Sequence, residues 1–185
     1  MSTTECSSTP EPVKEHITKN TFMRLLASSA TILGEGAVIE RLRRMPGIRL
    51  DEHVVNSALI YDECGRSAME RICRQYLEIG RTYDLPLLLS TPTWRAGQDH
   101  TAAAGLTGRD LNGDNFRFLD TLRREYGAYS RNVVICGLMS CRGDAYKPEE
   151  ALPTAEARIY HTWQSEALAS AGVDLLLAAT LLNVV

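Results

Sequence analysis

The stretch Leu85–Thr91 (LPLLLST) is a short apolar run that contains Pro86 and is followed by Pro92. Two later runs have the same character, Asn132–Met139 (NVVICGLM) and Val173–Thr180 (VDLLLAAT). Apolar runs of this length without polar alternation are typical of strands buried on both faces, as in a parallel sheet. A shorter extended segment, Thr31–Ala37 (TILGEGA), precedes them and ends in glycines. The pattern therefore predicts four strands in one buried parallel sheet.

Amphipathic segments separate these strands. Arg66–Tyr83 and Thr154–Ala171 place apolar side chains at steps of three and four residues, and Asn115–Tyr126 does the same over a shorter length. We expect Thr154 to cap its helix and Gly172 to follow that helix in a left-handed conformation. The alternation predicts an α/β fold, either an open doubly wound sheet or a (β/α) barrel. Shorter helical segments are expected at Thr21–Ser29, Arg41–Arg44 and Asp51–Ile60, and loops at Arg95–Gly113 and Ser140–Pro153.

The composition is that of an ordinary globular protein. The 185 residues are 44% hydrophobic and 23% charged, with a formal net charge of −3. This balance excludes a strong overall attraction to nucleic acid or to a membrane surface, and no apolar run is long enough for a membrane span. Residues 1–20 are polar and lack the apolar centre of a secretory signal, so we expect a disordered tail, one domain over 21–185 and a cytoplasmic protein.

The cysteine pattern gives no metal or disulfide framework. The count is odd and the spacing does not repeat, which favours reduced thiols. The close pair Cys136 and Cys141 lacks the two-residue spacing of a typical metal or redox motif. No glycine-rich nucleotide-binding loop is present either. The five cysteines are Cys6, Cys64, Cys73, Cys136 and Cys141.

Polar loops follow Thr91 and Met139, at the carboxyl ends of two expected strands, where both candidate architectures place their functional sites. In the loops, Asp114 is expected to cap the helix that follows it, and Arg142 is expected to pair with Asp144. The sequence ends shortly after the fourth strand with no helix to cover it. We therefore expect either a fragment or a strand that another chain covers.

Three segments resemble the homocysteine S-methyltransferase family, the zinc-dependent thiol methyltransferases. They are Ile32–Leu42 (ILGEGAVIERL), Ser90–Ala96 (STPTWRA) and Gly137–Tyr146 (GLMSCRGDAY). His161–Thr180 is also similar to the family, including Ala-Gly-Val-Asp before the fourth strand. The resemblance runs from about Ile32 to the C-terminus.

The resemblance implies a (β/α)8 barrel of which 21–185 supplies the four strands of the N-terminal half. In the family, zinc activates the thiol of homocysteine for attack on a sulfonium or betaine-type methyl donor, which gives methionine. The zinc ligands of the family lie on later strands, so none is assigned here, and we expect this chain alone to be inactive. Alternatives are a non-catalytic module that binds a small molecule, assembles with itself or joins a complementary half-barrel, and the product of a broken reading frame.

The resemblance also implies a substrate site. Glu35 at the end of the first strand is expected to bind the amino group of homocysteine, and the backbone amides of Gly36 and Ala37 its carboxylate. Two departures from the family bear on this site: Glu35 stands where Asp is common, and Ala179 stands where an acidic residue is frequent. The expected substrate-binding residues are Glu35, Gly36, Ala37, Thr91, Thr93, Trp94, Gly143 and Asp144, with Thr93 and Trp94 lining the pocket and contacting the donor cation.

Overall fold

The structure is a computed structural model that describes residues 18–181. Its strands form one parallel sheet in the order β1-β2-β3-β4, so each strand pairs with its neighbour in sequence. The strand order does not reverse, as it would in a doubly wound sheet. Of the predicted tail, 1–20, residues up to 17 lie outside the described part. The strands are β1 (Leu33–Gly34), β2 (Leu87–Ser90), β3 (Val133–Met139) and β4 (Leu175–Ala178).

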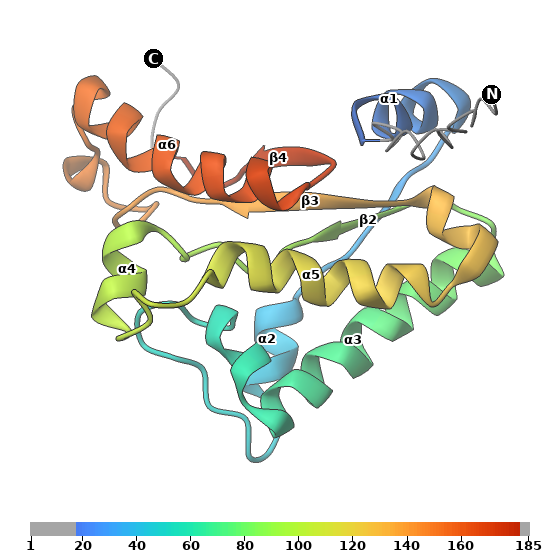
Figure 1. Ribbon diagram of the computed structural model, residues 1–185, viewed down its shortest axis with the longest axis horizontal. Helices are drawn as coiled ribbons and strands as arrows, with labels where there is room; N and C mark the ends of the chain where they lie inside the picture. The colour runs from blue at the N-terminus through green and yellow to red at the C-terminus, as the bar shows by residue number, and fades with distance from the viewer. Residues whose placement is uncertain (1–17, 182–185) are drawn as a thin grey trace, which may run out of the picture.

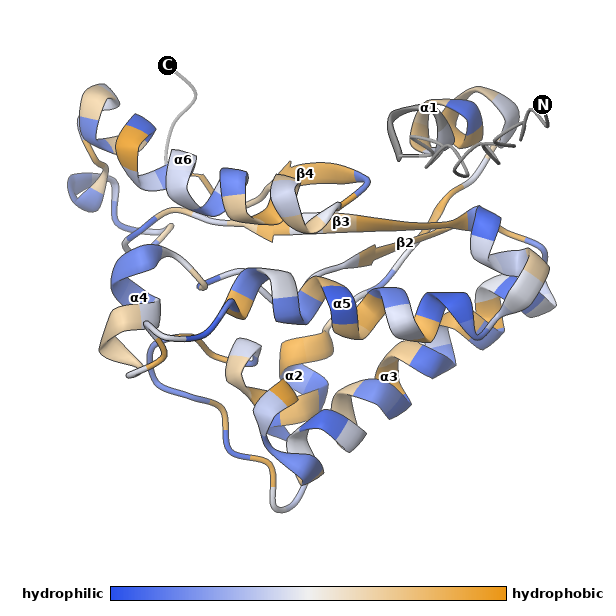
Figure 2. Ribbon diagram, in the orientation of Figure 1, coloured by the Kyte–Doolittle hydropathy of each residue, from blue (hydrophilic) through white to orange (hydrophobic). Residues whose placement is uncertain are grey.

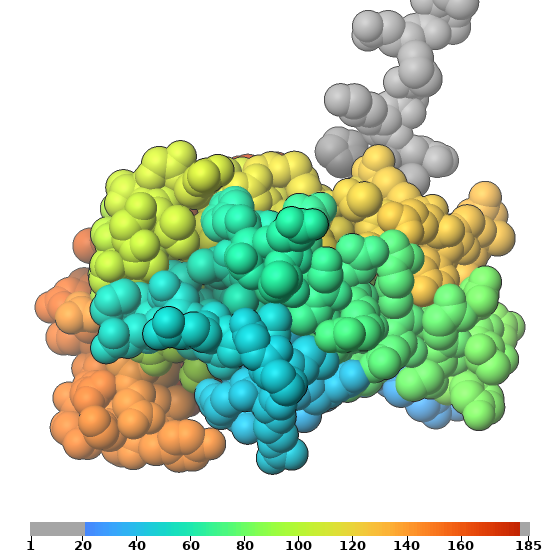
Figure 3. Space-filling model, turned by 90° about the horizontal axis from the view of Figure 1, so that it is seen from below, coloured from blue at the N-terminus to red at the C-terminus, as the bar shows by residue number. Residues whose placement is uncertain are grey.

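The helices that follow the strands cover one face of this sheet (Figure 1). Figure 3 looks onto this side of the molecule, where the chain from α2 through η1 to α3 lies across the centre. Helix α1 lies apart from them, against η2 and the edge strand β4. The helices are α1 (Thr18–Ser28), α2 (Val38–Arg43), α3 (Glu63–Thr82), α4 (Gln98–Ala103), α5 (Leu111–Arg124) and α6 (Thr154–Ala171), with 3₁₀ turns η1 (Ser57–Tyr61), η2 (Gly127–Asn132) and η3 (Pro148–Glu150).

The main core lies between the sheet and helices α3 and α5. Alternate strand residues face these helices, because side chains along a strand point to opposite faces in turn. Gly137 belongs to the same face, since a Cβ there would lie 3.0 Å from the Leu168 side chain of α6. Figure 2 shows hydrophobic strands and helices with a polar outer side. Fully buried members of this core include Leu42, Ile72, Leu77, Leu87, Leu89 and Ile135.

The predicted loop Arg95–Gly113 is wrong in two respects. It contains the short helix α4, and α5 begins at Leu111 rather than at Asn115. The α5 cap is Asp110, whose side chain accepts a hydrogen bond from the Gly113 amide at 3.1 Å. The predicted cap, Asp114, lies in the first turn instead.

The ends of α6 follow the prediction Thr154–Ala171, but its cap does not. Pro153 occupies the cap position without a side-chain hydrogen bond, so Thr154 is the first helical residue. Gly172 has a φ of 101°, which confirms the expected left-handed residue after the helix. Within residues 18–181, no helix is long and apolar enough to cross a membrane.

Strand β4 is one edge of the described sheet, and the prediction that it is buried on both faces is wrong. Leu176 and Leu177 are 42% and 37% exposed. Strand β3 pairs with one side of β4, whereas no strand of the described chain pairs with its other side. The apolar run therefore predicted the strand correctly but not its burial, because burial requires neighbours on both sides.

Candidate functional site

The site begins where β1 ends. The Glu35 amide still donates to the carbonyl of Leu88, at 3.4 Å, but the chain then turns away from β2. The Glu35 carboxylate accepts a hydrogen bond from the Ser90 amide at 3.0 Å, so it takes the place of a further strand carbonyl. Ala37 has a φ of 54° and occupies the cap position before α2. This turn brings the Glu35 carboxyl to the carboxyl end of the sheet.

Burial controls the electrostatics around Glu35. Removal from water raises the pKa of the Glu35 carboxyl to about 7, and the hydrogen bond from Ser90 opposes part of this rise. The same effect raises the pKa of the Cys73 thiol to about 12 and that of Cys136 to about 11. Near neutral pH these two thiols are therefore protonated, while Glu35 changes between its neutral and charged forms.

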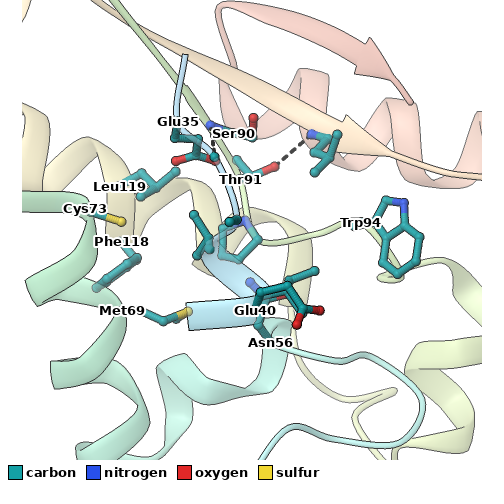
Figure 4. Close-up of a pocket in the computed structure, with 16 residues that line it drawn as sticks. Glu35, Glu40, Asn56, Met69, Cys73, Ser90, Thr91, Trp94, Phe118 and Leu119 are labelled. Carbon is teal, nitrogen blue, oxygen red and sulfur yellow. Dashed lines mark hydrogen bonds between the residues drawn. The ribbon is translucent and has the colours of Figure 1, made fainter. Parts of the chain in front are cut away.

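A cavity of about 280 Å³ opens beside Glu35. Figure 4 shows Glu35, Ser90 and Thr91 at one end, with Trp94 on the opposite side from Cys73 and Phe118. The wall formed by α3 and α5 is apolar, whereas the strand ends, Glu40 of α2 and Asn56 supply the polar groups. The lining residues are Glu35, Gly36, Ala37, Val38, Ile39, Glu40, Asn56, Met69, Cys73, Ser90, Thr91, Pro92, Trp94, Phe118, Leu119 and Leu138.

The Gly36 backbone already has a partner in the protein. Its amide donates to the Tyr76 hydroxyl at 3.2 Å, and this hydroxyl donates to the Gly36 carbonyl at 2.5 Å. The Gly36 amide could bind a ligand carboxylate only if Tyr76 moved. Among the predicted amides, Ala37 is therefore the better candidate for this contact.

The hydroxyls of Thr91 and Thr93 join β2 to β3. Thr91 Oγ1 accepts from the Leu138 amide at 3.0 Å, and Thr93 Oγ1 donates to the Leu138 carbonyl at 2.8 Å. The two hydroxyls are 2.6 Å apart, and both residues are fully buried. Thr91 lines the cavity, whereas the Thr93 hydroxyl is directed toward β3.

A second cavity, of about 410 Å³, holds the predicted residues Gly143 and Asp144 together with Thr180. Trp94 lines both cavities, and its indole Nε1 donates to Thr180 Oγ1 at 2.9 Å. The predicted pair of Arg142 with Asp144 is wrong. Arg142 pairs instead with Asp99 of α4, at 3.4 Å, because α4 occupies the segment that was expected to be a loop. The predicted site residues thus divide between two cavities that share Trp94, except Thr93. The prediction that Thr93 lines the pocket is wrong, because its side chain is fully buried and bonds to β3.

Several lining residues were not predicted as part of the site. Met69 and Cys73 come from α3, and Phe118 and Leu119 come from α5. Each belongs to an apolar stripe of its helix, and such a stripe has the same pattern whether it faces a core or a cavity. Asn56 precedes a 3₁₀ turn and carried no recognisable signal.

The thiols present do not fit a zinc site. Within the described part of the chain, no group of three His, Cys, Asp or Glu side chains could hold a metal ion. Cys136 donates to the Ser90 hydroxyl at 3.3 Å, and Cys141 to the Gly143 carbonyl at 3.4 Å. Burial raises the pKa of each of these thiols and of Cys73, which opposes the thiolate form that a metal requires. Cys6 lies outside the described residues.

Comparison with known proteins gives one family. A family model described as homocysteine S-methyltransferase matches residues 32–185. The matched range includes all four strands and every predicted site residue. No curated protein and no solved structure gives a significant match.

Proposed function

This chain belongs to the homocysteine S-methyltransferase family, and we propose that its cavity beside Glu35 binds homocysteine. The observation that carries this proposal is a half-buried carboxyl at the end of β1 that accepts the Ser90 amide, in a small cavity with an apolar wall from α3 and α5. A carboxyl with a pKa of about 7 is poised to ionise when a cation arrives. The ammonium group of an amino acid is such a cation.

The lining suggests how the ligand is oriented. The ammonium group contacts Glu35, and the carboxylate contacts the backbone amide of Ala37. The methylene groups then lie against Met69 and Phe118, whose side chains exclude water, and the thiol points toward Trp94. A cavity of about 280 Å³ suits a small amino acid rather than a peptide or a nucleotide.

The methyl donor of the family carries a positive charge, and Trp94 is the natural group to receive it. The Arg95 guanidinium already lies 5.7 Å from the centre of the Trp94 ring, so this ring is placed to attract a cation. We assign the donor to the second cavity, on the other side of Trp94 from Glu35. A sulfonium or quaternary ammonium compound would compete with Arg95 for the indole.

Binding is tested by calorimetry with two ligands. Homocysteine should bind with one site per chain, whereas 4-mercaptobutyrate, which lacks the amino group, should bind at least about ten-fold more weakly because it makes no charge-assisted bond to Glu35. Equal affinity for the two compounds would show that Glu35 does not recognise the ammonium group. No binding of either compound would refute the proposed function.

We further propose that this chain does not methylate homocysteine on its own. Within the described residues no three His, Cys, Asp or Glu side chains are grouped to hold a metal ion: Cys136 and Cys141 bond to protein acceptors, Cys73 is buried and Cys64 is exposed. The test is an assay of purified protein with homocysteine, zinc and S-methylmethionine. Methionine formation above a control without protein would contradict this proposal.

The sheet itself favours the first half of a (β/α)8 barrel. Four parallel strands in sequential order, with α3, α5 and α6 on one face, are the arrangement that such a barrel requires. Leu176 and Leu177 on the edge strand β4 are exposed, and β1 forms only two pairs with β2. A second copy related by a two-fold axis along the strands would place its β1 beside β4 with parallel polarity.

Light scattering coupled to size exclusion tests this arrangement. The proposal predicts a dimer that the substitution Leu177→Lys converts to monomer, because a charge at the closed edge would be desolvated. A monomer at all protein concentrations would refute closure by a second copy. Leu181→Lys, in the exposed segment after β4, is a control for a general effect of added charge.

A further inference from the structure

The loop that carries Trp94 is held by four side chains, each from a different part of the fold. All four are buried and bond to backbone carbonyls of residues 92–96. We call this set the carbonyl clasp. In this set, Ser57 donates to the Pro92 carbonyl, Gln164 to that of Thr93 at 2.7 Å, Ser140 to that of Trp94 at 2.8 Å and Asn112 to that of Ala96 at 3.0 Å.

Gln164 is the unusual member of the carbonyl clasp. It lies in the middle of α6 and is only 1% exposed, one turn before the fully buried Leu168. Its Nε2 donates to the Thr93 carbonyl and, at 3.2 Å, to Asn112 Oδ1. A side-chain amide buried on the inward side of a helix destabilises the folded state unless its hydrogen bonds are made. Gln164 therefore links α6 and α5 to the loop residue that precedes Trp94.

Trp94 itself is less constrained than its backbone. Its carbonyl is bonded to Ser140, while the indole lies between two cavities and contacts Thr180 at its outer end. The position of the indole therefore depends on where the clasp holds the loop. No residue of α6 lines either cavity, so α6 can affect a ligand only indirectly, and Gln164 bonds directly to the loop that carries Trp94.

We propose that Gln164 is a positioning residue: through the Thr93 carbonyl it fixes Trp94 at the boundary of the two cavities and thereby sets the affinity for ligand. The part of this inference that concerns ligand rests on the proposed function. The part that concerns Trp94 does not, because the hydrogen bonds of the clasp exist without ligand. An apolar side chain of similar volume would fill the same space but leave the Thr93 carbonyl and Asn112 Oδ1 without this donor.

The experiment uses Trp94 fluorescence in the Trp163→Phe background, which leaves one tryptophan. Gln164→Met should raise the acrylamide quenching of Trp94 and shift its emission to longer wavelength. It should also weaken homocysteine binding by roughly ten-fold, because Trp94 lines the cavity and a displaced indole would contact the ligand less closely. Gln164→Asn keeps an amide but is one methylene too short, so it should act in the same direction and provides a second variant.

The matched control is Leu168→Val, which removes one methylene from the same buried side of α6 and does not touch the loop. It should lower stability without changing Trp94 quenching or ligand affinity. Unchanged Trp94 quenching in both Gln164 variants, or an equal change in Leu168→Val, would overturn the proposal. If the parent protein does not bind homocysteine but Gln164→Met still alters Trp94, the proposed function fails and the positioning role stands.

Discussion

Replacement of Glu35 by Gln should stabilise the protein at alkaline pH while weakening ligand binding. The folded state raises the pKa of this carboxyl from 4.5 to about 7. A carboxyl with a raised pKa binds its proton more tightly in the folded state, so the folded protein loses stability as pH rises from 4.5 toward 7 and no more beyond it. At about 1.4 kcal/mol per pKa unit, ionisation of Glu35 costs about 3 kcal/mol of unfolding free energy.

The glutamine variant carries no such cost at any pH. We therefore expect the stability difference between Glu35→Gln and the parent to grow by about 2.5 kcal/mol in favour of the variant from pH 5 to pH 8. Urea unfolding followed by circular dichroism at several pH values measures this difference. Glu78→Gln is the matched control, because Glu78 lies in an exposed pair with Arg81 and its removal should have a small, nearly constant effect.

A Glu35→Gln variant that is less stable than the parent at pH 8 would refute this reasoning. A stability difference that is the same at pH 5 and pH 8 would also do so, since it would mean that the carboxyl is not desolvated. The expected result has a functional meaning. A carboxyl whose ionisation is costly in the free protein is stabilised when a cationic ligand pairs with it, so the stability gained by removing the charge should be accompanied by lost binding.

Three further substitutions test other parts of the structure. Gly80→Ala should destabilise the protein by roughly 1–3 kcal/mol in urea unfolding, because the new Cβ would lie 1.9 Å from the Tyr129 hydroxyl; wild-type stability would show that α3 does not pack this closely. Arg123→Met should cost about 3 kcal/mol at neutral pH by leaving the buried Asp174 carboxylate unpaired, and a loss below about 1 kcal/mol would contradict this. Ala179→Glu adds an acid where the resemblance implies one and should tighten homocysteine binding about ten-fold in calorimetry, and unchanged affinity would show that an acid there does not contact the ammonium group.

Strands β2, β3 and β4 were predictable because each lies in a short apolar run, a pattern that is typical of a buried strand. The exposure of β4 was not predictable, because the exposure of Leu176 and Leu177 depends on what lies beyond the edge of the sheet. The start of α5 was also missed. Asp110 and Asp114 both lie near the start of a helical pattern, and only the observed bond to the Gly113 amide shows that Asp110 is the cap.

The site was partly predictable for a related reason. Glu35 follows a strand and lies between glycines, which marks a turn at the carboxyl end of the sheet. The apolar wall could not be found from sequence, because Met69 and Phe118 continue stripes that also build the core. Gln164 did carry a signal: it is a polar residue within the inward side of α6, where the pattern otherwise predicts apolar side chains.

The pH dependence of homocysteine affinity tests the central role of Glu35 most directly. Calorimetry between pH 5.5 and pH 7.5 should show affinity for the parent protein falling as pH drops below 7, approaching ten-fold per unit, because protonation of Glu35 removes the partner of the ammonium group. Cys73 and Cys136 stay neutral throughout this range, so they do not contribute. Glu35→Gln should bind weakly and without pH dependence. A flat profile for the parent, or the same profile for both proteins, would contradict the assignment.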